Sequence, residues 1–141
     1  MKINQVNILN SQVQYKLSTL QRTCLPYDYP YDTTAGFWWI ATTTSGSAVA
    51  FAGLVRSSRW SDSGYLCRAG VVPSSRKQGI QKKLIRVRIK KAKVLKMKWL
   101  VTDTYDNPAS SNNLISCGFK LFNPSVPWGA EGTLYWRLKL E

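Results

Sequence analysis

The stretch VVPSSRKQGIQKKLI, residues 71–85, combines residue types that bind phosphate groups. An apolar, strand-like run ends at Pro73, and after two serines comes a basic segment with the pattern of a helix. Gly79 lies in the first turn of that predicted helix, where a glycine costs about 1 kcal/mol relative to alanine. A glycine there lets a ligand approach the backbone closely, and a helix N-terminus attracts anions. Arg76, Lys77 and Lys82 add positive charge near this helix start. The segment is therefore a candidate binding site for a diphosphate, which we call the cradle. The alternative is an ordinary basic helix start with an incidental glycine.

Histidine is absent from the sequence, which excludes the Ser-His and Cys-His pairs of many nucleophilic enzymes. The three cysteines, Cys24, Cys67 and Cys117, are odd in number and widely spaced. Without histidine they do not predict a zinc site, so we expect no metal. Reduced, mostly buried thiols are typical of a cytoplasmic protein. The N-terminal residues lack the apolar core of a secretion signal, and no apolar run is long enough to predict a membrane span.

The sequence carries a net charge of +13, and its cations are concentrated between Arg76 and Lys98. No acidic residue occurs between Asp62 and Asp103. Such a distribution attracts phosphates, nucleic acid or an acidic surface, while the alternative is a solvated helix face in a basic protein. RNA or DNA would contact this basic helix, and its bases would stack on the tryptophans expected in loops, Trp60 and Trp128.

Hydrophobic periodicity locates the elements that must hold these residues. Apolar side chains recur at helical spacing within residues 10–25, and Ser11 with Gln14 fits a capping box at the start of that helix. Gly70 interrupts a later strand-like run, which predicts a bulge or a close backbone approach. Three strands are expected in this half of the chain, at residues 37–43, 48–55 and 65–72.

The basic helix is predicted over residues 75–96, with Ser75 and Gln78 as a second capping box. A strand follows at residues 99–105, and the order strand, helix, strand predicts a parallel pair joined by a crossover. A further helix is expected after this strand, because Asn107 is a good N-cap, Pro108 fits the first helical position and Gly118 fits just past the end. The helix face opposite the apolar one carries Lys82, Arg86, Lys90 and Lys93.

Two strands, at residues 119–122 and 133–140, close the chain. In the last one, alternation predicts that Leu134 and Trp136 face the core while Tyr135 and Arg137 face away from it. We therefore predict an α+β fold in a single domain spanning residues 1–141. Its central sheet is expected to be mixed and mostly antiparallel, with one parallel strand–helix–strand crossover and helices on both faces.

The same residues resemble the two signatures of the GNAT superfamily of N-acetyltransferases. The first signature is V-x-P, two residues, then Arg/Gln-x-x-Gly-x-Gly/Ala, and it is matched by Val71, Pro73, Arg76 and Gly79, with Gln81 at its last position. The second is an asparagine followed eleven residues later by Gly-Phe, and it is matched by Asn107, Gly118 and Phe119. With the strand–turn–strand of residues 36–53 and the closing LYWRLKL, the resemblance covers nearly the whole chain.

The resemblance implies a GNAT-like fold, acetyl-CoA as the cofactor, and direct transfer of the acetyl group to a primary amine in a ternary complex. The backbone of the strand end would pair with the pantetheine arm and the acetyl group, and amides of the following loop would hold the pyrophosphate. The implied cofactor-binding residues are Ala69, Gly70, Val71, Arg76, Lys77, Gln78, Gly79, Ile80, Gln81, Lys82 and Asn107.

The catalytic positions of the family are vacant in this sequence. Where many members have a tyrosine acid and some a glutamate base, this chain has Leu114 and Thr102. Asp103 and Tyr105 share one face of the predicted strand, and either could relay a proton. The alternatives are that Tyr105 packs while Asp103 caps or pairs with a lysine, that an amine with a pKa of about 7–8 needs no protein base, or that catalysis is lost.

The acceptor is an amine on a small molecule, a protein or a nucleic acid, and the sequence does not decide among them. It also leaves the oligomeric state open, a dimer included. We predict an acetyl-CoA-dependent N-acetyltransferase; the alternatives are a basic nucleic-acid-binding protein and a catalytically impaired pseudoenzyme that binds acyl-CoA. The proline-broken, aromatic segment at residues 26–34 is the candidate substrate-binding region, through Tyr27, Asp28, Tyr29, Tyr31 and Asp32.

Overall fold

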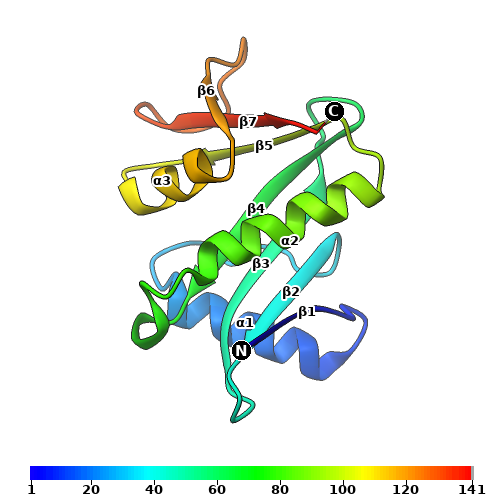
Figure 1. Ribbon diagram of the computed structural model, residues 1–141, viewed down its shortest axis with the longest axis vertical. Coiled ribbons are helices and arrows are strands. Elements are labelled where there is room, and N and C mark those ends of the chain that lie inside the picture. The colour runs from blue at the N-terminus through cyan, green and yellow to red at the C-terminus, as the bar shows by residue number, and fades with distance from the viewer. Residues whose placement is uncertain (141) are drawn as a thin grey trace.

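The structure, a computed structural model, describes residues 1–140. These residues form one seven-stranded sheet, three α-helices and a short 3-10 turn (Figure 1). In chain order the elements are β1 (Lys2–Val6), α1 (Ser11–Cys24), β2 (Phe37–Thr42), β3 (Ala48–Arg56), β4 (Ser63–Val71), the turn η1 (Pro73–Ser75), α2 (Ile80–Val94), β5 (Trp99–Thr104), α3 (Pro108–Ser116), β6 (Lys120–Phe122) and β7 (Leu134–Lys139).

The strands lie in the order β1-β2-β3-β4-β5-β7-β6. Neighbouring strands are antiparallel except β4 and β5, which are parallel and are joined through α2. The predicted α+β fold with one strand–helix–strand crossover is therefore confirmed. None of the helices within residues 1–140 has the length and apolar character needed to cross a membrane.

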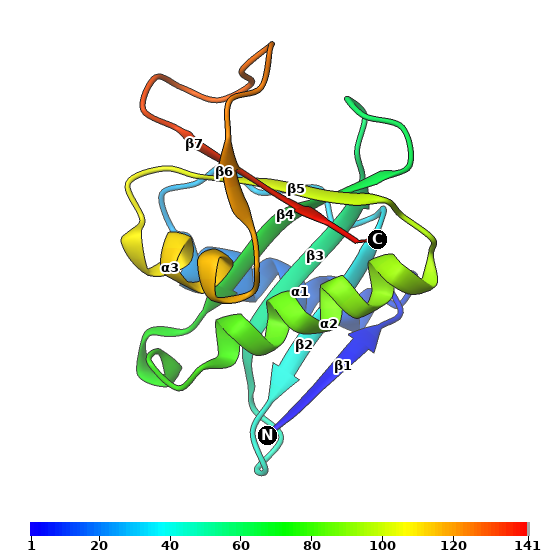
Figure 2. The same cartoon turned by 45° about the horizontal axis from the view of Figure 1, so that its top comes forward.

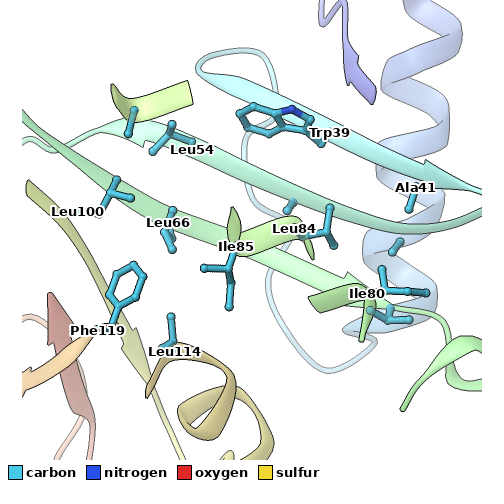
Figure 3. Close-up of a cluster of buried hydrophobic side chains, with 14 of the residues drawn as sticks. Trp39, Ala41, Leu54, Leu66, Ile80, Leu84, Ile85, Leu100, Leu114 and Phe119 are labelled. Atoms are coloured by element: carbon cyan, nitrogen blue, oxygen red, sulfur yellow. The ribbon is translucent and has the colours of Figure 1, made fainter. Parts of the chain in front are cut away.

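Alternating side chains of the central strands bury both faces of the sheet, as predicted. In β2, Trp38 and Ile40 pack with α1, whereas Trp39 and Ala41 belong to the cluster on the opposite face. Figure 2 shows α2 in front of the sheet and α1 behind it. The cluster under α2 is the larger one, and it also holds Leu114 of α3 together with Leu54, Leu66, Leu84, Ile85, Leu100 and Phe119 (Figure 3).

The sheet opens between its two parallel strands. β4 and β5 pair only from Ser63 to Tyr65, opposite Trp99 to Val101, although β4 continues to Val71. Besides this pairing, two side-chain bonds link the strands: the Thr102 hydroxyl donates to the Leu66 carbonyl at 2.9 Å, and the Tyr65 hydroxyl donates to Asp103 at 2.7 Å. The two strands diverge in Figures 1 and 2 as well, and the resulting wedge is the place where the fold leaves room inside the sheet.

Both predicted capping boxes are wrong. The N-cap of α1 is Asn10, because its side-chain oxygen accepts from the backbone N–H of both Gln12 and Val13. α2 begins at Ile80, five residues later than predicted. A helix cannot run through the segment before it, because the backbone takes left-handed φ angles of 64° at Lys77 and 77° at Gly79.

Three other local predictions can be compared with the structure. The close approach at Gly70 is confirmed, because a Cβ there would lie 2.6 Å from the Cβ of Cys24. The limits of α3 are confirmed as well, with Asn107 as N-cap and Gly118 following the helix. The alternation in β7 is confirmed for buried Trp136 and exposed Arg137 and is wrong for the strand's start, because Tyr135 is buried between β6 and a loop while Leu134 is exposed. The sequence analysis did not predict strand β1, which has a mostly exposed pattern.

Candidate active site

A cleft of about 620 Å³ lies between the end of β4, the loop that leads into α2, and the start of α3. Most of the predicted cofactor residues line it: Ala69, Gly70, Val71, Arg76, Lys77, Gly79, Ile80, Gln81 and Asn107. Gln78 and Lys82, which were also predicted, do not line it. The sequence analysis did not assign further lining residues from α1, the 3-10 turn and α3, namely Cys24, Leu25, Ser75, Ala109, Ser110, Asn112 and Asn113.

The start of α2 presents free backbone donors to this cleft. Side chains of Asn10 and Asn107 cap the first turns of α1 and α3, but Gly79 gives α2 no side-chain cap. A Cβ at Gly79 would meet no atom within 4 Å, so the space above this glycine is open. The Arg76 Nε donates to the Val71 carbonyl at 3.0 Å, and this bond fixes the Arg76 side chain across the turn. An uncapped helix start with adjacent cations is suited to an anion.

A second cavity of about 330 Å³ occupies the wedge between β4 and β5, and we call it the transfer cavity. It adjoins the cleft, because both are lined by Leu25, Ala69, Gln81, Asn107, Ser110 and Asn113. Its remaining lining comes from β4, β5, α2, α3 and the loops after α1 and β5, and it includes Asp28, Asp103, Tyr105, Thr102 and Leu114. A long ligand with an anionic end can therefore pass from the α2 N-terminus into the sheet.

Asp103 is the best-positioned carboxylate in the transfer cavity. One of its oxygens, Oδ2, accepts from the Tyr65 hydroxyl at 2.7 Å and from the Trp128 indole nitrogen at 2.8 Å. Within residues 1–140 the other oxygen, Oδ1, has no hydrogen bond from the protein. Burial and the neighbouring Asp103 carboxylate raise the pKa of Tyr65 above its usual range, so this phenol stays a neutral donor. The alternative prediction, that Asp103 caps a helix or pairs with a lysine, is wrong, because the hydrogen bonds to its carboxylate come from Tyr65 and Trp128.

The other catalytic candidate, Tyr105, and the two vacant positions, Leu114 and Thr102, lie at the same cavity. Tyr105 lines it but is 62% exposed, just beyond the end of β5, so it does not pack as the alternative expected. Leu114 is buried and contributes apolar surface to the cavity wall. Thr102 uses its hydroxyl to bridge β5 to the Leu66 carbonyl. The positions where family members have an acid and a base thus face the cavity without titratable groups.

The predicted substrate-binding segment contributes less to the cavity than expected. Asp28 lines the transfer cavity and pairs with Arg68 at 3.2 Å, and Tyr29 lines a smaller pocket beside it. Tyr27 is 98% exposed and lines none of these spaces. Tyr31 packs against Trp38 in the core. The Asp32 carboxylate accepts from the backbone and hydroxyl of Thr34, and these bonds lower the pKa of Asp32.

The two loop tryptophans have contacts that differ from the predicted stacking on nucleic acid. Trp128 packs on Tyr135 with ring centroids 4.6 Å apart, bonds to Asp103, and carries the Arg59 guanidinium 4.7 Å from its ring centre. Trp60 packs on Phe122 at 5.3 Å. Both indoles are half-buried, and Trp128 helps to fix the carboxylate of Asp103.

The three cysteines are free thiols, and burial raises the pKa of Cys24 and Cys67. Raised values make these thiols poor nucleophiles at neutral pH. Within residues 1–140, no group of three histidine, cysteine, aspartate or glutamate side chains is arranged to hold a metal ion.

Comparisons with known proteins agree with this fold. An IAA acetyltransferase from Bacillus cereus is 17% identical over 98% of both chains, with a TM-score of 0.75. A Bacillus subtilis acetyltransferase solved in complex with CoA is 16% identical over 98% of this chain and 97% of that chain, with a TM-score of 0.73. A chain of the NatC complex bound to Gag peptide and CoA is 16% identical over 100% of both chains, with a TM-score of 0.77.

No curated protein sequence is similar enough to count as a relative. The family model described as Acetyltransferase (GNAT) family matches residues 6–119, which include the cleft, the transfer cavity and both resembling segments. The chain therefore belongs to the GNAT acetyltransferase family.

Proposed function

We propose that this protein is an N-acetyltransferase that transfers the acetyl group of acetyl-CoA to a primary amine. The observation that carries the proposal is the pair of adjoining spaces that lead from the uncapped start of α2 to the carboxylate of Asp103. Family membership supports acyl transfer, and the presence of CoA in two solved structures of the same fold supports the choice of donor.

The cleft residues fit the diphosphate end of such a donor. The first-turn amides of α2 are uncapped, Gly79 leaves open space above them, and Arg76 and Lys77 supply positive charge. The Asn107 side-chain oxygen caps α3 through the Ser110 N–H at 3.1 Å, so only its amide nitrogen is free to donate into the cleft. The wedge edge at Ala69 to Val71 is the backbone that would pair with the extended pantetheine arm.

Acetyl-CoA, when bound, supplies a thioester: the amine nitrogen forms a bond to the acetyl carbon, the carbon–sulfur bond breaks, and one proton leaves the nitrogen. Asp103 is the group that orients the amine, because its free Oδ1 can accept a hydrogen bond while Oδ2 is held by Tyr65 and Trp128. A carboxylate fixed in this way aligns the nitrogen with the thioester, and alignment alone supplies a large part of a rate enhancement. The proton passes to Oδ1 or to water in the cavity.

The acceptor is proposed to be small or to present its amine on a flexible segment, because the transfer cavity encloses only about 330 Å³. A cytoplasmic protein is proposed, in keeping with its free thiols. The basic helix raises nucleic-acid-linked amines as one acceptor class, and a pseudoenzyme that only binds acyl-CoA is the other alternative.

The test is a titration of the protein with acetyl-CoA followed by addition of a panel of amines. Binding together with release of free CoA thiol, detected by a thiol reagent, and a mass increase of one acetyl group on the amine would support the proposal. Binding without thiol release for any amine would favour the pseudoenzyme. Absence of binding would reject the proposal.

A further inference from the structure

Arg88 is a buried cation at the transfer cavity. It lies on the face of α2 that packs against the sheet and is 3% exposed. Its Nε donates to the Leu84 carbonyl and its Nη1 to the Gly53 carbonyl, both at 3.1 Å. Arg88 also lines the transfer cavity but not the cofactor cleft. It therefore lies at the end of the path where the acyl group and the amine must meet.

The bond to Gly53 has a structural reason. Ala52 pairs with Ala69 and Leu54 with Leu66, so two residues of β4 oppose Gly53 alone in a β-bulge. Arg88 donates to the carbonyl of Gly53 at this irregular position. One part of the guanidinium thus maintains the shape of β4 beside the wedge.

The rest of the guanidinium has no protein partner. A guanidinium has five N–H donors, and the two bonds from Nε and Nη1 leave Nη2 unused. Within residues 1–140, every fully buried side-chain nitrogen or oxygen has a hydrogen-bond partner. Nη2 has none and must therefore be accessible, and the accessible space that Arg88 lines is the transfer cavity.

No carboxylate neutralises this cation. Among residues 1–140 the ion pair that meets a 4 Å limit joins Arg68 to Asp28, and Asp103 is held by Tyr65 and Trp128. Burial lowers the pKa of Arg88 to about 10, and the titratable groups that oppose this shift are the thiols of Cys67 and Cys117. A buried cation without a counter-ion is unfavourable, and a bound anion would offset that cost.

We propose that the transfer cavity binds a carboxylate through the Nη2 of Arg88, so that one of the two partners in acyl transfer is itself an acid. The inference rests on the proposed function. The carboxylate belongs either to an acyl-CoA whose acyl chain ends in an acid, such as succinyl-CoA, or to an amine acceptor that carries one, such as an amino acid. It takes no part in the bond changes and only fixes its molecule against Arg88.

Matched substrate pairs distinguish these two sources. The first arm compares succinyl-CoA with butyryl-CoA, using one neutral amine as acceptor. The second arm compares γ-aminobutyrate with its amide, using acetyl-CoA as donor. We expect kcat/KM to favour the acidic member about 10- to 100-fold in one of the arms, the range for a hydrogen bond to a charged group. No preference in either arm overturns the inference and leaves acetyl transfer to a neutral amine intact.

Variants assign the preference to Arg88. Arg88→Gln should reduce the acid-to-neutral ratio of kcat/KM to near one by raising KM for the acidic partner, whereas Arg88→Lys should retain part of the ratio. Arg86→Gln is the control, because this residue is an exposed arginine on the same helix, and it should leave the ratio unchanged. A ratio that survives in folded Arg88→Gln overturns the inference and leaves Arg88 with its bond to Gly53 only.

A binding measurement covers the case in which no substrate pair turns over. Succinate and γ-aminobutyrate are titrated by calorimetry into the wild-type protein, Arg88→Lys and Arg88→Gln, with circular dichroism as the check on folding. Binding that is lost in Arg88→Gln, or weakened in Arg88→Lys if the first variant does not fold, supports a carboxylate site. Binding that is absent in the wild type, or unaffected by either change, rejects it independently of the reaction.

Discussion

Replacement of Gly79 tests the proposed cradle most directly. Gly79 has a φ of 77°, where a residue with a Cβ is strained, yet an added Cβ would meet no atom within 4 Å. The change to alanine therefore carries a backbone cost and no packing cost. For a left-handed residue that cost is about 1–2 kcal/mol, which corresponds to a fall in Tm of about 3–6 °C for a chain of this size.

The change to glutamate adds a charge to the same strain. A carboxylate about 4 Å from a diphosphate oxygen costs about 1 kcal/mol per charge pair at the dielectric constant of water and about 4 kcal/mol at an effective dielectric constant of 20. An exposed loop is closer to the first limit. We therefore expect Gly79→Glu to weaken CoA binding at least about 5-fold relative to Gly79→Ala, with the same loss of Tm in both variants.

Gly46 offers a matched control within the same chain. It lies in the turn between β2 and β3, has a φ of 90°, and also has no atom within 4 Å of an added Cβ. Gly46→Ala and Gly46→Glu should lower Tm as much as the changes at Gly79, yet leave CoA affinity unchanged in a calorimetric titration. Equal CoA affinities for Gly79→Glu and Gly46→Glu would refute the cradle, whatever happens to stability.

Four further outcomes are expected. Asp103→Asn should raise KM for the amine at least about 10-fold with CoA affinity unchanged, while the exposed Asp106→Asn is neutral; equal amine KM values would reject Asp103 as the anchor. Leu114→Tyr should change kcat less than about 10-fold, and a gain of orders of magnitude at constant KM would instead indicate an impaired natural site. Because the pKa of Tyr65 is raised in the folded state, its contribution to stability falls as pH rises above about 10, so denaturant titrations should show a smaller alkaline loss for Tyr65→Phe than for the wild type. Arg86→Glu combined with Lys90→Glu should leave CoA affinity unchanged and, if RNA or DNA binds, weaken that binding and flatten its salt dependence at two salt concentrations; a loss of CoA affinity alone would dismiss the nucleic-acid alternative.

The arrangement of the sheet was predictable from the sequence because its signals are local. Apolar runs bounded by turn residues locate β2 to β5, and the strand–helix–strand order around α2 requires the parallel pair. The limits of α3 follow from Asn107, whose side chain caps the first turn, and from Gly118, which takes a left-handed φ after the helix. Strand β1 lacks such a signal, because it is a mostly exposed edge strand that pairs only with β2.

The cleft-lining residues were predictable to a similar extent, since most of them lie within residues 69–81 at one strand–helix turn. The start of α2 was not, because the serines after Pro73 resemble an N-cap while the backbone forms a 3-10 turn and then two left-handed residues. Gly79 is consequently the N-cap itself, with a conformation that its residue type makes inexpensive. A glycine would destabilise the interior of a helix, but at the N-cap of α2 it adopts the left-handed φ without strain.

Side chains that meet across the fold were beyond the sequence patterns. Arg88 belongs to a run of lysines and arginines whose other members are mostly exposed. Its spacing from Leu84 and Ala92 places it on the apolar face of α2, but the basic run hid that signal. Asp103 was identified only as one of two residues on a strand face, because its partners Tyr65 and Trp128 come from distant segments. Contacts at such separations depend on register, and register was not deducible from the apolar pattern alone.

The β-bulge at Gly53 connects the fold to the proposed chemistry. The register of β4 changes between Leu66 and Ala69, immediately beyond the last pairing of β4 with β5, so the irregularity lies at the mouth of the wedge. On one side of the sheet it brings Arg68 to Asp28, and on the other its opposing carbonyl accepts from Arg88. The cation that bonds to the strand opposite the bulge is thus also a cation of the cavity wall, at the point where β4 and β5 separate.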